Sequence, residues 1–360
     1  MRKHIKLSQK DKNRARFIGV DLGDRFSHAC VLDAAGDVVA RERVATTPAA
    51  FERYFMAYAG VAVAIETGTH STWVSRTLKQ CGLSVVVANA REVRKIHQSH
   101  RKNDRSDAET LARMLRADVK LLAPITHRHP DRHADLAVVR ARDVVVRART
   151  KFINAVRGTV KTHGERLPNC STHCFARRAA EAIPAPLQPA LRPLLQMIET
   201  LTEQIRAYDQ RIDALARERY PQTAAVAQVA GVGPLVSLTF VLTLDDPARF
   251  AHSRDVGPYL GLVPRQYDSG DYQSQLPITK AGNTYLRRLL VGSAQYVLGP
   301  FGPDCQLRRY GERLAQRGGK NAKKRAVVAV ARKLAVLLHH LWSTGAVYDP
   351  LYRSQPSIAA

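Results

Sequence analysis

Residues 17–117 alternate short apolar runs with helical segments, and this order limits the fold more than any other feature of the chain. Five runs have the length and composition of strands: residues 17–21, 27–33, 38–44, 61–66 and 84–88. Three segments have helical spacing of their apolar side chains: residues 48–58, 71–81 and 104–117. The resulting β-β-β-α-β-α-β order predicts an α/β fold, with an RNase H-like domain at the start of the chain.

Two carboxylates stand at the ends of predicted buried strands. Asp21 closes the first strand and Glu66 closes the fourth, and a carboxylate in such a place is costly unless it is hydrogen-bonded or bound to a cation. Asp104 and Asp107 lie three residues apart at a helix start, so they share one face of that helix. Taken singly, either could simply stabilise the helix start. Together the four acids predict a site for Mg²⁺ or Mn²⁺, which prefer oxygen ligands, of the kind that activates phosphodiester chemistry.

The charge of the chain favours a nucleic-acid partner. Fifty-six Lys and Arg against 31 Asp and Glu give a net charge of +25 over 360 residues, which suits phosphate backbones. A basic surface without a specific partner, or one that binds membranes, is the alternative. The run between residues 300 and 333 is especially basic. Within it we expect Lys320, Lys323 and Lys324 to hold phosphates and not to read bases.

The start of the chain also resembles that of actin-like sugar kinases, which open with a similar strand. Those enzymes need further glycine-rich phosphate loops, and the middle of this chain contains no Asp-Gly-Thr or Gly-Gly pair after a strand. A kinase also has no use for so large a positive charge. The sequence therefore disfavours this class.

Cysteine usage and the N-terminal residues predict a cytoplasmic protein with no membrane partner. The five cysteines form no paired framework, which is typical of a reducing compartment. Residues 1–16 are polar and basic, unlike a signal peptide, and no uninterrupted apolar run reaches the roughly 18 residues of a membrane span. Cys170, His173 and Cys174 resemble half of a zinc site, but no second pair of ligands follows at a suitable distance, so we expect a loop there.

Three domains are predicted, over residues 16–130, 131–220 and 221–350. The middle one reads as a helical connector in which residues 168–193, rich in proline, form an irregular linker. After the linker, apolar residues recur every three or four positions from Leu194 to Leu215 over about three heptads. This spacing fits a coiled coil, and it fits equally an amphipathic helix packed on its own domain.

The third domain is expected to be mainly α-helical and to begin with a helix-hairpin-helix turn. Residues 229–234 place Gly231 and Gly233 between two helical stretches. Glycines in such a turn let backbone N–H groups approach a phosphate. Turns of this composition also join many unrelated helix pairs, so the pattern alone is weak.

Taken together, these motifs resemble one family over nearly the whole chain, the DEDD insertion-sequence transposases related to Piv-type DNA invertases. The first half carries the family's acidic motifs, which are Gly19-Val20-Asp21, Ile65-Glu66-Thr67-Gly68 and Lys102-Asn103-Asp104-x-x-Asp107-Ala108. The second half carries a more specific set, which is Ala230-Gly231-Val232-Gly233-Pro234, Tyr259-Leu260-Gly261-Leu262-Val263-Pro264-Arg265, Ser269-Gly270 and Ile278-Thr279-Lys280-Ala281-Gly282-Asn283-x-Tyr285-Leu286-Arg287.

The resemblance implies a RuvC-like domain that carries Asp21, Glu66, Asp104 and Asp107, and a transposase domain whose serine becomes covalently linked to DNA. That serine corresponds to Ser269, although Asp268 precedes it where relatives often have a second serine. The resemblance also implies donor and target DNA, a structured noncoding guide RNA, and homodimers that assemble into tetramers. Basic residues surround the serine and are expected to bind nucleic acid: Arg265, Lys280, Arg287 and Arg288.

The sequence therefore predicts a transposase or site-specific recombinase that cuts and rejoins DNA strands. Two alternatives stay open. One is a junction-resolving, RNase H-like nuclease that hydrolyses DNA and forms no covalent intermediate. The other is a basic nucleic-acid-binding protein without catalytic activity.

Overall fold

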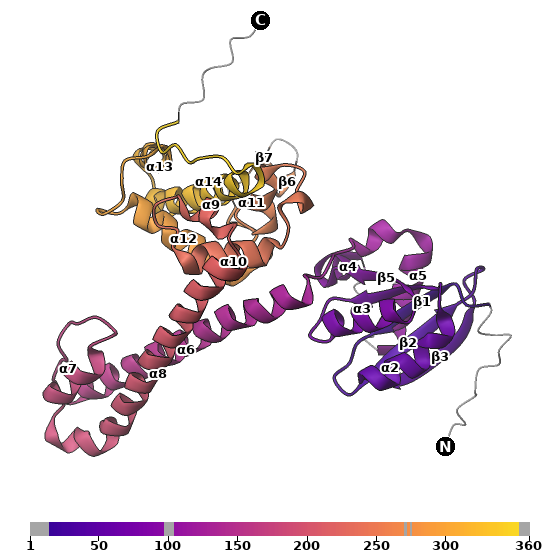
Figure 1. Cartoon of the computed structure of the whole chain (residues 1–360), viewed down its shortest axis with the longest axis horizontal. Helices are drawn as coiled ribbons and strands as arrows, with labels where there is room; N and C mark the ends of the chain where they lie inside the picture. The colour runs from indigo at the N-terminus through magenta and orange to yellow at the C-terminus, as the bar shows by residue number, and fades with distance from the viewer. Residues whose placement is uncertain (1–13, 97–103, 270–271, 274–275, 353–360) are drawn as a thin grey trace, which may run out of the picture. The chain divides into compact units, whose positions relative to one another are not determined.

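The computed structural model divides the chain into two compact units, Met1–His127 and Arg128–Ala360 (Figure 1). It describes residues 14–96, 104–269, 272–273 and 276–352, and for residues 94–96, 104–105, 268–269 and 272–273 it describes the backbone alone.

A five-stranded mixed sheet forms the centre of the first unit. Its strands are β1 (Phe17–Asp21), β2 (Phe26–Leu32), β3 (Val38–Ala45), β4 (Ala62–Glu66) and β5 (Ser84–Ala88). They lie in the order β3-β2-β1-β4-β5. β2 runs antiparallel to both β1 and β3, whereas β4 runs parallel to β1, and β5 runs parallel to β4. The predicted α/β, RNase H-like architecture is confirmed.

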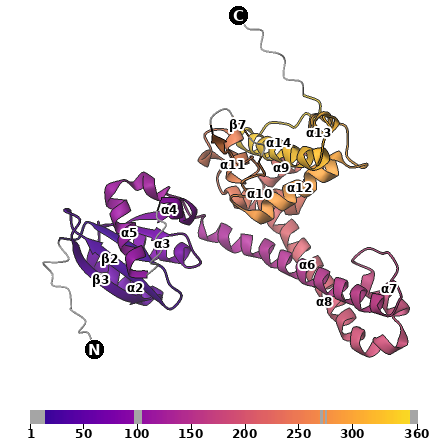
Figure 2. The same ribbon diagram turned by 180° about the vertical axis from the view of Figure 1, so that it is seen from behind.

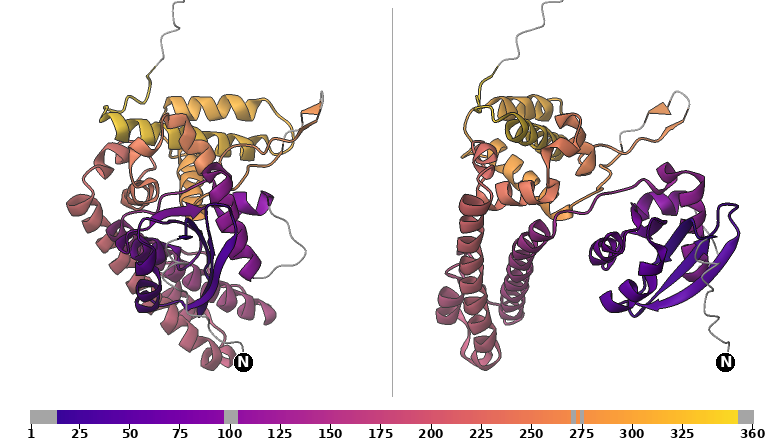
Figure 3. Two further views of the ribbon diagram at one scale, coloured as in Figure 1. Left: turned by 90° about the vertical axis from the view of Figure 1, so that its right-hand side faces the viewer. Right: turned by 45° about the vertical axis from the view of Figure 1, so that its right-hand side comes forward.

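Helices cover both faces of this sheet (Figure 3). On one face α2 (Pro48–Phe55) and α3 (Ser71–Gln80) bury Phe51 and Leu78 against Ile18 of β1. On the other face α5 (Asp104–Ala117) packs on β1, β2 and β4. The shorter elements η1 (Met56–Tyr58), α4 (Ala90–Ile96) and η2 (Val119–Leu122) complete the unit.

Gly19 lets α5 lie directly against β1. A Cβ atom at this position would lie 2.1 Å from the carbonyl oxygen of Ala108 and 2.4 Å from the amide nitrogen of Ala112. Any larger residue at position 19 would therefore push the helix off the strand. This contact fixes which part of α5 crosses the centre of β1.

Two long helices, α6 (Pro130–Thr162) and α8 (Gln188–Ala214), lie side by side in the second unit (Figure 2). They are antiparallel, because Arg142 pairs with Asp209 and Arg149 donates to Thr202 farther along. The Arg142 Nε to Asp209 Oδ1 distance is 2.6 Å. At the end of this helical pair, Ile153 and Ile198 pack with the connecting segment into a separate hydrophobic core.

The connecting segment corrects the prediction of an irregular linker at residues 168–193. It contains α7 (Phe175–Ala182), with Phe175 buried in that separate core, followed by η3 (Ala185–Leu187) and the first residues of α8. Pro184 and Pro186 lie at the start of η3 and Pro189 at the start of α8, where a missing N–H costs nothing. Pro193 lies within α8, and Pro168 lies outside any helix. No group of metal-binding side chains occurs at Cys170 and Cys174 or elsewhere among the described residues, and both thiols are free.

The regularly spaced apolar residues of α8 pack against other parts of the same chain. Ile198 belongs to the core at the end of the helical pair, whereas Ile212 belongs to the main core of the second unit. Ile205 between them is also buried. The structure therefore shows an amphipathic helix packed on its own chain, and an oligomer contact through this helix stays a prediction.

Helices surround the main core of the second unit. They are η4 (Leu215–Arg219), α9 (Thr223–Ala227), α10 (Pro234–Leu244), η5 (Pro247–Arg249), η6 (Ser253–Asp255), α11 (Val256–Tyr259), α12 (Thr284–Leu298), α13 (Gln306–Gln316) and α14 (Ala322–Thr344). A small hairpin of β6 (Asp268–Ser269) and β7 (Tyr272–Gln273) lies between α11 and α12. Helix α14 is long and apolar enough to cross a membrane by length and composition, a test that buried core helices also pass. It contributes Val330, Leu334 and Leu338 to the core.

Candidate functional site

The carboxyl ends of β1 and β4 bring Asp21 and Glu66 to the same edge of the sheet. The two strands are neighbours and parallel, and Val20 is opposite Ile65 in their register. The next residue of each strand is therefore the acid. Both acids are partly exposed, as expected for side chains that leave the sheet at its edge.

Helix α5 brings its first turn to this same edge. Ala108 and Ala112 lie against Gly19, whereas Arg116, near the end of the helix, reaches the carbonyl of Ala34 beyond the opposite end of β1. The helix consequently runs antiparallel to β1. Asp107 immediately precedes Ala108 and is partly exposed, and α5 begins at Asp104. The side chain of Asp104 lies outside the described residues.

The residues at this edge are chemically suited to a hard divalent cation. Asp21, Glu66 and Asp107 supply only carboxylate oxygens, the ligands that Mg²⁺ and Mn²⁺ prefer. Among the side chains that the structure describes, no three acids, histidines or cysteines are already close enough together to form a metal site. The fit therefore rests on the kind of donors and on the strand ends and helix turn that carry them.

Glu109, two residues after Asp107, belongs to a different environment. Its carboxylate accepts hydrogen bonds from Arg41 on β3 at 2.6 Å and from Arg113 on α5 at 2.7 Å. The hydrogen bond from Arg41, followed by that from Arg113, holds the pKa of Glu109 below its ordinary value of 4.5. This acid therefore fixes α5 to the sheet, and its carboxylate is already paired with two arginines.

Sequence reasoning missed a polar group that follows the same strand ends. The indole Nε1 of Trp73 donates to Nδ1 of His70 at 3.1 Å, and His70 Nε2 lies 3.5 Å from the Asp24 carboxylate. Asp24 follows β1 and His70 follows β4, so both chain segments leave the edge that carries Asp21 and Glu66. The only signal in the sequence is their position a few residues after those two acids.

In the second unit, Ser269 lies on the hairpin between α11 and α12. The backbone of Ser269 pairs with that of Tyr272, and its side chain lies outside the described residues. Lower in the hairpin, Arg265 donates its backbone N–H to Pro277 at 3.0 Å, and Thr279 donates to Val263 at 2.9 Å. Figure 3 shows the short strands projecting from the body of the second unit.

Two glycines allow the base of this hairpin to close. Gly261 and Gly282 both have positive φ, and a Cβ at Gly261 would lie 2.2 Å from the amide nitrogen of Ala281. A Cβ at Gly282 would lie 2.1 Å from the carbonyl oxygen of Tyr259. Only glycine permits both the conformation and the approach. The two most specific motifs of the sequence thus meet backbone to backbone.

Arg287 corrects part of the predicted nucleic-acid surface. Its side chain is buried, and its guanidinium donates to the carbonyl of Leu260 at 2.8 Å and to that of Ala281 at 2.6 Å. It also donates to the Thr284 hydroxyl at 3.2 Å. Arg287 therefore links the two sides of the hairpin base and does not present its charge at the surface.

The other predicted basic residues lie at the surface. Arg265 and Lys280 are exposed on the two sides of the hairpin. Arg288 is about half exposed, forms an ion pair with Asp143 of α6 and lies over the Tyr285 ring. The three lysines predicted to hold phosphates are also exposed, beside the start of α14: Lys320, Lys323 and Lys324.

The helix-hairpin-helix turn joins α9 to α10, and its two glycines differ. Gly231 has a φ of 84°, and its carbonyl accepts a hydrogen bond from Ser293 of α12 at 2.7 Å. A Cβ there would lie 2.8 Å from the Tyr296 ring, whereas a Cβ at Gly233 would meet nothing within 4 Å. Gly231 therefore packs the turn against α12. Gly233, at the start of α10, leaves the backbone accessible.

Both halves of the chain match models of known protein families. Residues 18–164 match a model described as a DEDD transposase of the IS110 type, and residues 223–310 match one described as the IS116/IS110/IS902 family of transposases. The chain belongs to the IS110 family of insertion-sequence transposases. The first match contains the carboxylate edge, and the second contains the hairpin with Ser269.

Similar proteins carry names that agree with this family. The transposase for insertion sequence element IS1111A of Coxiella burnetii is 27% identical to this chain, over 97% of this chain and 96% of the relative. A probable family 20 transposase of Pseudomonas aeruginosa is 28% identical over 92% of the chain and 98% of the relative. The pilin gene-inverting protein of Moraxella lacunata is 26% identical over 32% of the chain and 35% of the relative. The predicted relationship to both transposases and DNA invertases is therefore confirmed.

Proposed function

We propose that this transposase moves an insertion element by cutting and rejoining DNA with two separate chemical groups. Asp21, Glu66, Asp104 and Asp107 hold Mg²⁺ or Mn²⁺ at the carboxylate edge, and Ser269 is the nucleophile. The observation that carries the proposal is the contact of Gly19 with Ala108 and Ala112. It supports a common site because it directs the first turn of α5 to the strand ends that carry Asp21 and Glu66.

The bound cation would supply Lewis acidity to a phosphodiester, and the acids of this chain would hold it. Ser269 Oγ attacks a phosphorus atom, an Oγ–P bond forms, and the bond from phosphorus to the leaving strand oxygen breaks. The serine proton passes to a base, and the leaving oxygen gains a proton as a hydroxyl. The phosphoserine link keeps the energy of the original bond, so a second strand hydroxyl can displace the serine and complete the joining.

Basic residues of the second unit bind the nucleic acid in this proposal. Lys320, Lys323 and Lys324 contact phosphates, and the accessible backbone at Gly233 offers N–H groups to a further phosphate. Arg265, Lys280 and Arg288 lie on or beside the serine hairpin and add positive charge to it. Neutralising the three lysines would flatten the salt dependence of binding by roughly one unit of slope for each lost contact.

We further propose that a structured noncoding RNA guides the reaction, that homodimers assemble into tetramers on DNA, and that the protein acts in the cytoplasm. Family membership and the net charge of +25 support these points. The three domains at residues 16–130, 131–220 and 221–350 belong to the same proposal. Sequencing the nucleic acid that copurifies with the full chain tests the RNA, and light scattering with and without DNA tests the assembly.

The decisive experiment traps the serine on DNA. The full chain is incubated with Mg²⁺ and a nicked DNA of the element's end, then digested and examined by mass spectrometry. We expect a phosphodiester adduct on Ser269 and no adduct or strand joining with Ser269→Ala. An adduct on Tyr267, Tyr272, Ser274 or Thr279, or strand exchange by the alanine variant, would overturn the assignment. Cutting without an adduct or joining would instead favour a hydrolytic nuclease, and binding without cutting an inactive binding protein.

A further inference from the structure

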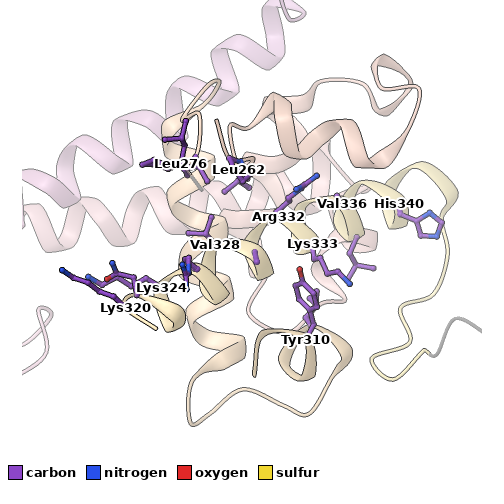
Figure 4. Close-up of a pocket in the computed structure, with 18 residues that line it drawn as sticks. Leu262, Leu276, Tyr310, Lys320, Lys324, Val328, Arg332, Lys333, Val336 and His340 are labelled. Atoms are coloured by element: carbon purple, nitrogen blue, oxygen red, sulfur yellow. The ribbon is translucent and has the colours of Figure 1, made fainter. Parts of the chain in front are cut away.

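A large groove lies along α14 in the second unit, next to the hairpin that carries Ser269. Its volume is about 1280 Å³, above the roughly 300–1,000 Å³ of sites for single small ligands. Leu276, Pro277 and Ile278, on the returning side of the hairpin, form one wall. Tyr310 of α13 forms the opposite wall (Figure 4). The groove therefore has room for an extended chain.

The floor of the groove is apolar. It includes Leu262 and Leu307, together with Val328, Val336 and Leu337 of α14. A polar or fully hydrated ligand would gain little from such a surface, because the favourable contribution here comes from removing apolar area from water. The occupant must therefore present flat or apolar faces of its own.

The rim of the groove is basic from end to end. Lys320 and Lys324 lie at one end, Arg332 and Lys333 near the middle, and His340 at the other end (Figure 4). The Nζ of Lys333 lies 4.1 Å from the centre of the Tyr310 ring. No acidic residue is among the described residues that line the groove. The occupant must therefore carry negative charge along its length.

We infer that this groove binds a single-stranded stretch of nucleic acid, with unpaired bases on the apolar floor and phosphates along the basic rim. Single strands present a repeated row of charges and exposed base faces, and proteins bind them with basic grooves and aromatic side chains. A duplex hides its base faces and offers the rim only phosphates. The inference rests on the proposed function, because it names the form of nucleic acid that the basic segment of the second unit receives.

The position of the groove gives the inference a mechanistic meaning. Leu276, Pro277 and Ile278 belong to the same hairpin as Ser269. A strand seated in the groove would contact that hairpin directly. The groove would thereby recognise nucleic acid in which base pairs have opened beside the serine.

The first test compares two tyrosines in the full chain. Tyr310→Leu removes the aromatic wall and keeps an apolar side chain, whereas Tyr352→Leu changes an exposed tyrosine that does not line the groove. Binding of a fluorescent 12-nucleotide oligouridine and of a duplex DNA of equal length is measured over a range of salt. We expect Tyr310→Leu to weaken oligouridine binding about tenfold, the size typical of losing one stacked base, with duplex binding and salt slope unchanged. Tyr352→Leu should match the wild type.

A second measurement keeps the test independent of folding. Wild-type protein is cross-linked to oligouridine containing 4-thiouridine, and the cross-linked peptides are mapped by mass spectrometry. We expect cross-links within residues 276–278, at Tyr310 and within residues 328–340. Cross-links confined to other surfaces would overturn the inference. Protection of these residues by an acidic peptide but not by oligouridine would also overturn it.

The two proposals fail in different ways. If the protein binds no nucleic acid of any kind and forms no adduct, the proposed function fails. If duplex binding and strand joining are intact while Tyr310→Leu leaves oligouridine affinity unchanged and cross-links miss the groove, the groove inference alone fails.

Discussion

The carboxylate edge and the serine hairpin are both positioned by glycines, but the glycines lie at different distances from the chemistry. Asp21 is two residues from Gly19, and Asp107 immediately precedes Ala108, which Gly19 contacts. Ser269 is instead four residues beyond Arg265, the last residue fixed to the hairpin base before β6. The acids therefore take their places from the packing of the sheet itself. The serine takes its place from a hairpin held at its base.

This difference fits the two kinds of chemistry. A metal site needs several ligands at fixed distances, so it gains from rigid elements. A nucleophile must reach one phosphorus atom on a large substrate, and a projecting hairpin gives it that access. Variants that act on one region and leave the other intact test this difference.

The largest effect is expected at the carboxylate edge. Asp21→Asn should lower strand cleavage by about 10³-fold or more, because loss of a metal ligand removes several kcal/mol of transition-state stabilisation. Titration calorimetry with Mn²⁺ should show weakened binding in Asp21→Asn and unchanged binding in Ser269→Ala. Asp37→Asn, an equal change of charge at an exposed acid in the turn between β2 and β3, serves as the control. Wild-type cleavage by Asp21→Asn, or in excess chelator, would remove the metal from the mechanism.

The next effect concerns the packing that positions the acids. Gly19→Ala would place a methyl group against the backbone of α5, and we expect a loss of about 3 kcal/mol in the free energy of unfolding of the first unit. Gly68→Ala is the matched control, because a Cβ there meets nothing within 4 Å, and it should change stability by less than about 0.5 kcal/mol. Urea unfolding followed by circular dichroism measures both. Equal stability of the two variants would contradict the close contact between α5 and β1.

Two neighbouring arginines offer a similar comparison in the second unit. Arg287→Gln leaves the carbonyls of Leu260 and Ala281 without their charged donor, so we expect it to cost about 2–3 kcal/mol. Arg288→Gln removes a partly exposed ion pair with Asp143 and should cost less than about 1 kcal/mol. Thermal unfolding of both variants checks the order. A larger loss for Arg288→Gln would show that the hairpin base is held in another way.

Much of the first unit could be predicted from sequence because its elements bury one regular face each. Apolar runs and helical periodicity predicted the order of strands and helices along the chain, and α5 has the predicted bounds of 104–117. The placement of Asp21 and Glu66 also followed, since parallel neighbouring strands end at the same edge. The sequence could not show that Asp107 and Glu109, two residues apart on one helix, lie in different environments. These acids differ through the reach of Arg41 from β3, which is a contact between distant residues.

The second unit was harder to predict for physical reasons. The prolines of residues 168–193 suggested an irregular linker, because proline breaks helix interiors. The prediction failed because proline is also favoured at helix starts. Arg287 and Arg288 look alike in sequence, yet one is buried and the other is exposed. The groove is formed by residues from 262 to 340 that no local pattern connects. The role of Ser269 came from the resemblance, because its own turn composition is common.

The smallest effect tests how α5 is fixed to the sheet. Glu109 is ionised at neutral pH, and the hydrogen bonds from Arg41 and then Arg113 keep its pKa below 4.5. A lowered pKa means that the unfolded chain takes up the proton first, so the stabilisation is complete above about pH 4.5 and is lost as pH falls through the folded value. Both arginines are half exposed, which limits the contribution to less than about 1 kcal/mol. Glu109→Gln should therefore lower the free energy of unfolding slightly at pH 7. Its difference from the wild type should shrink as the pH falls below about 4.5. Glu52→Gln, at an exposed acid on α2, should show no such pH-dependent difference. If the Glu109→Gln difference stayed constant from pH 7 into the acid range, the ion pairs of Glu109 would not be what fastens α5 to β3.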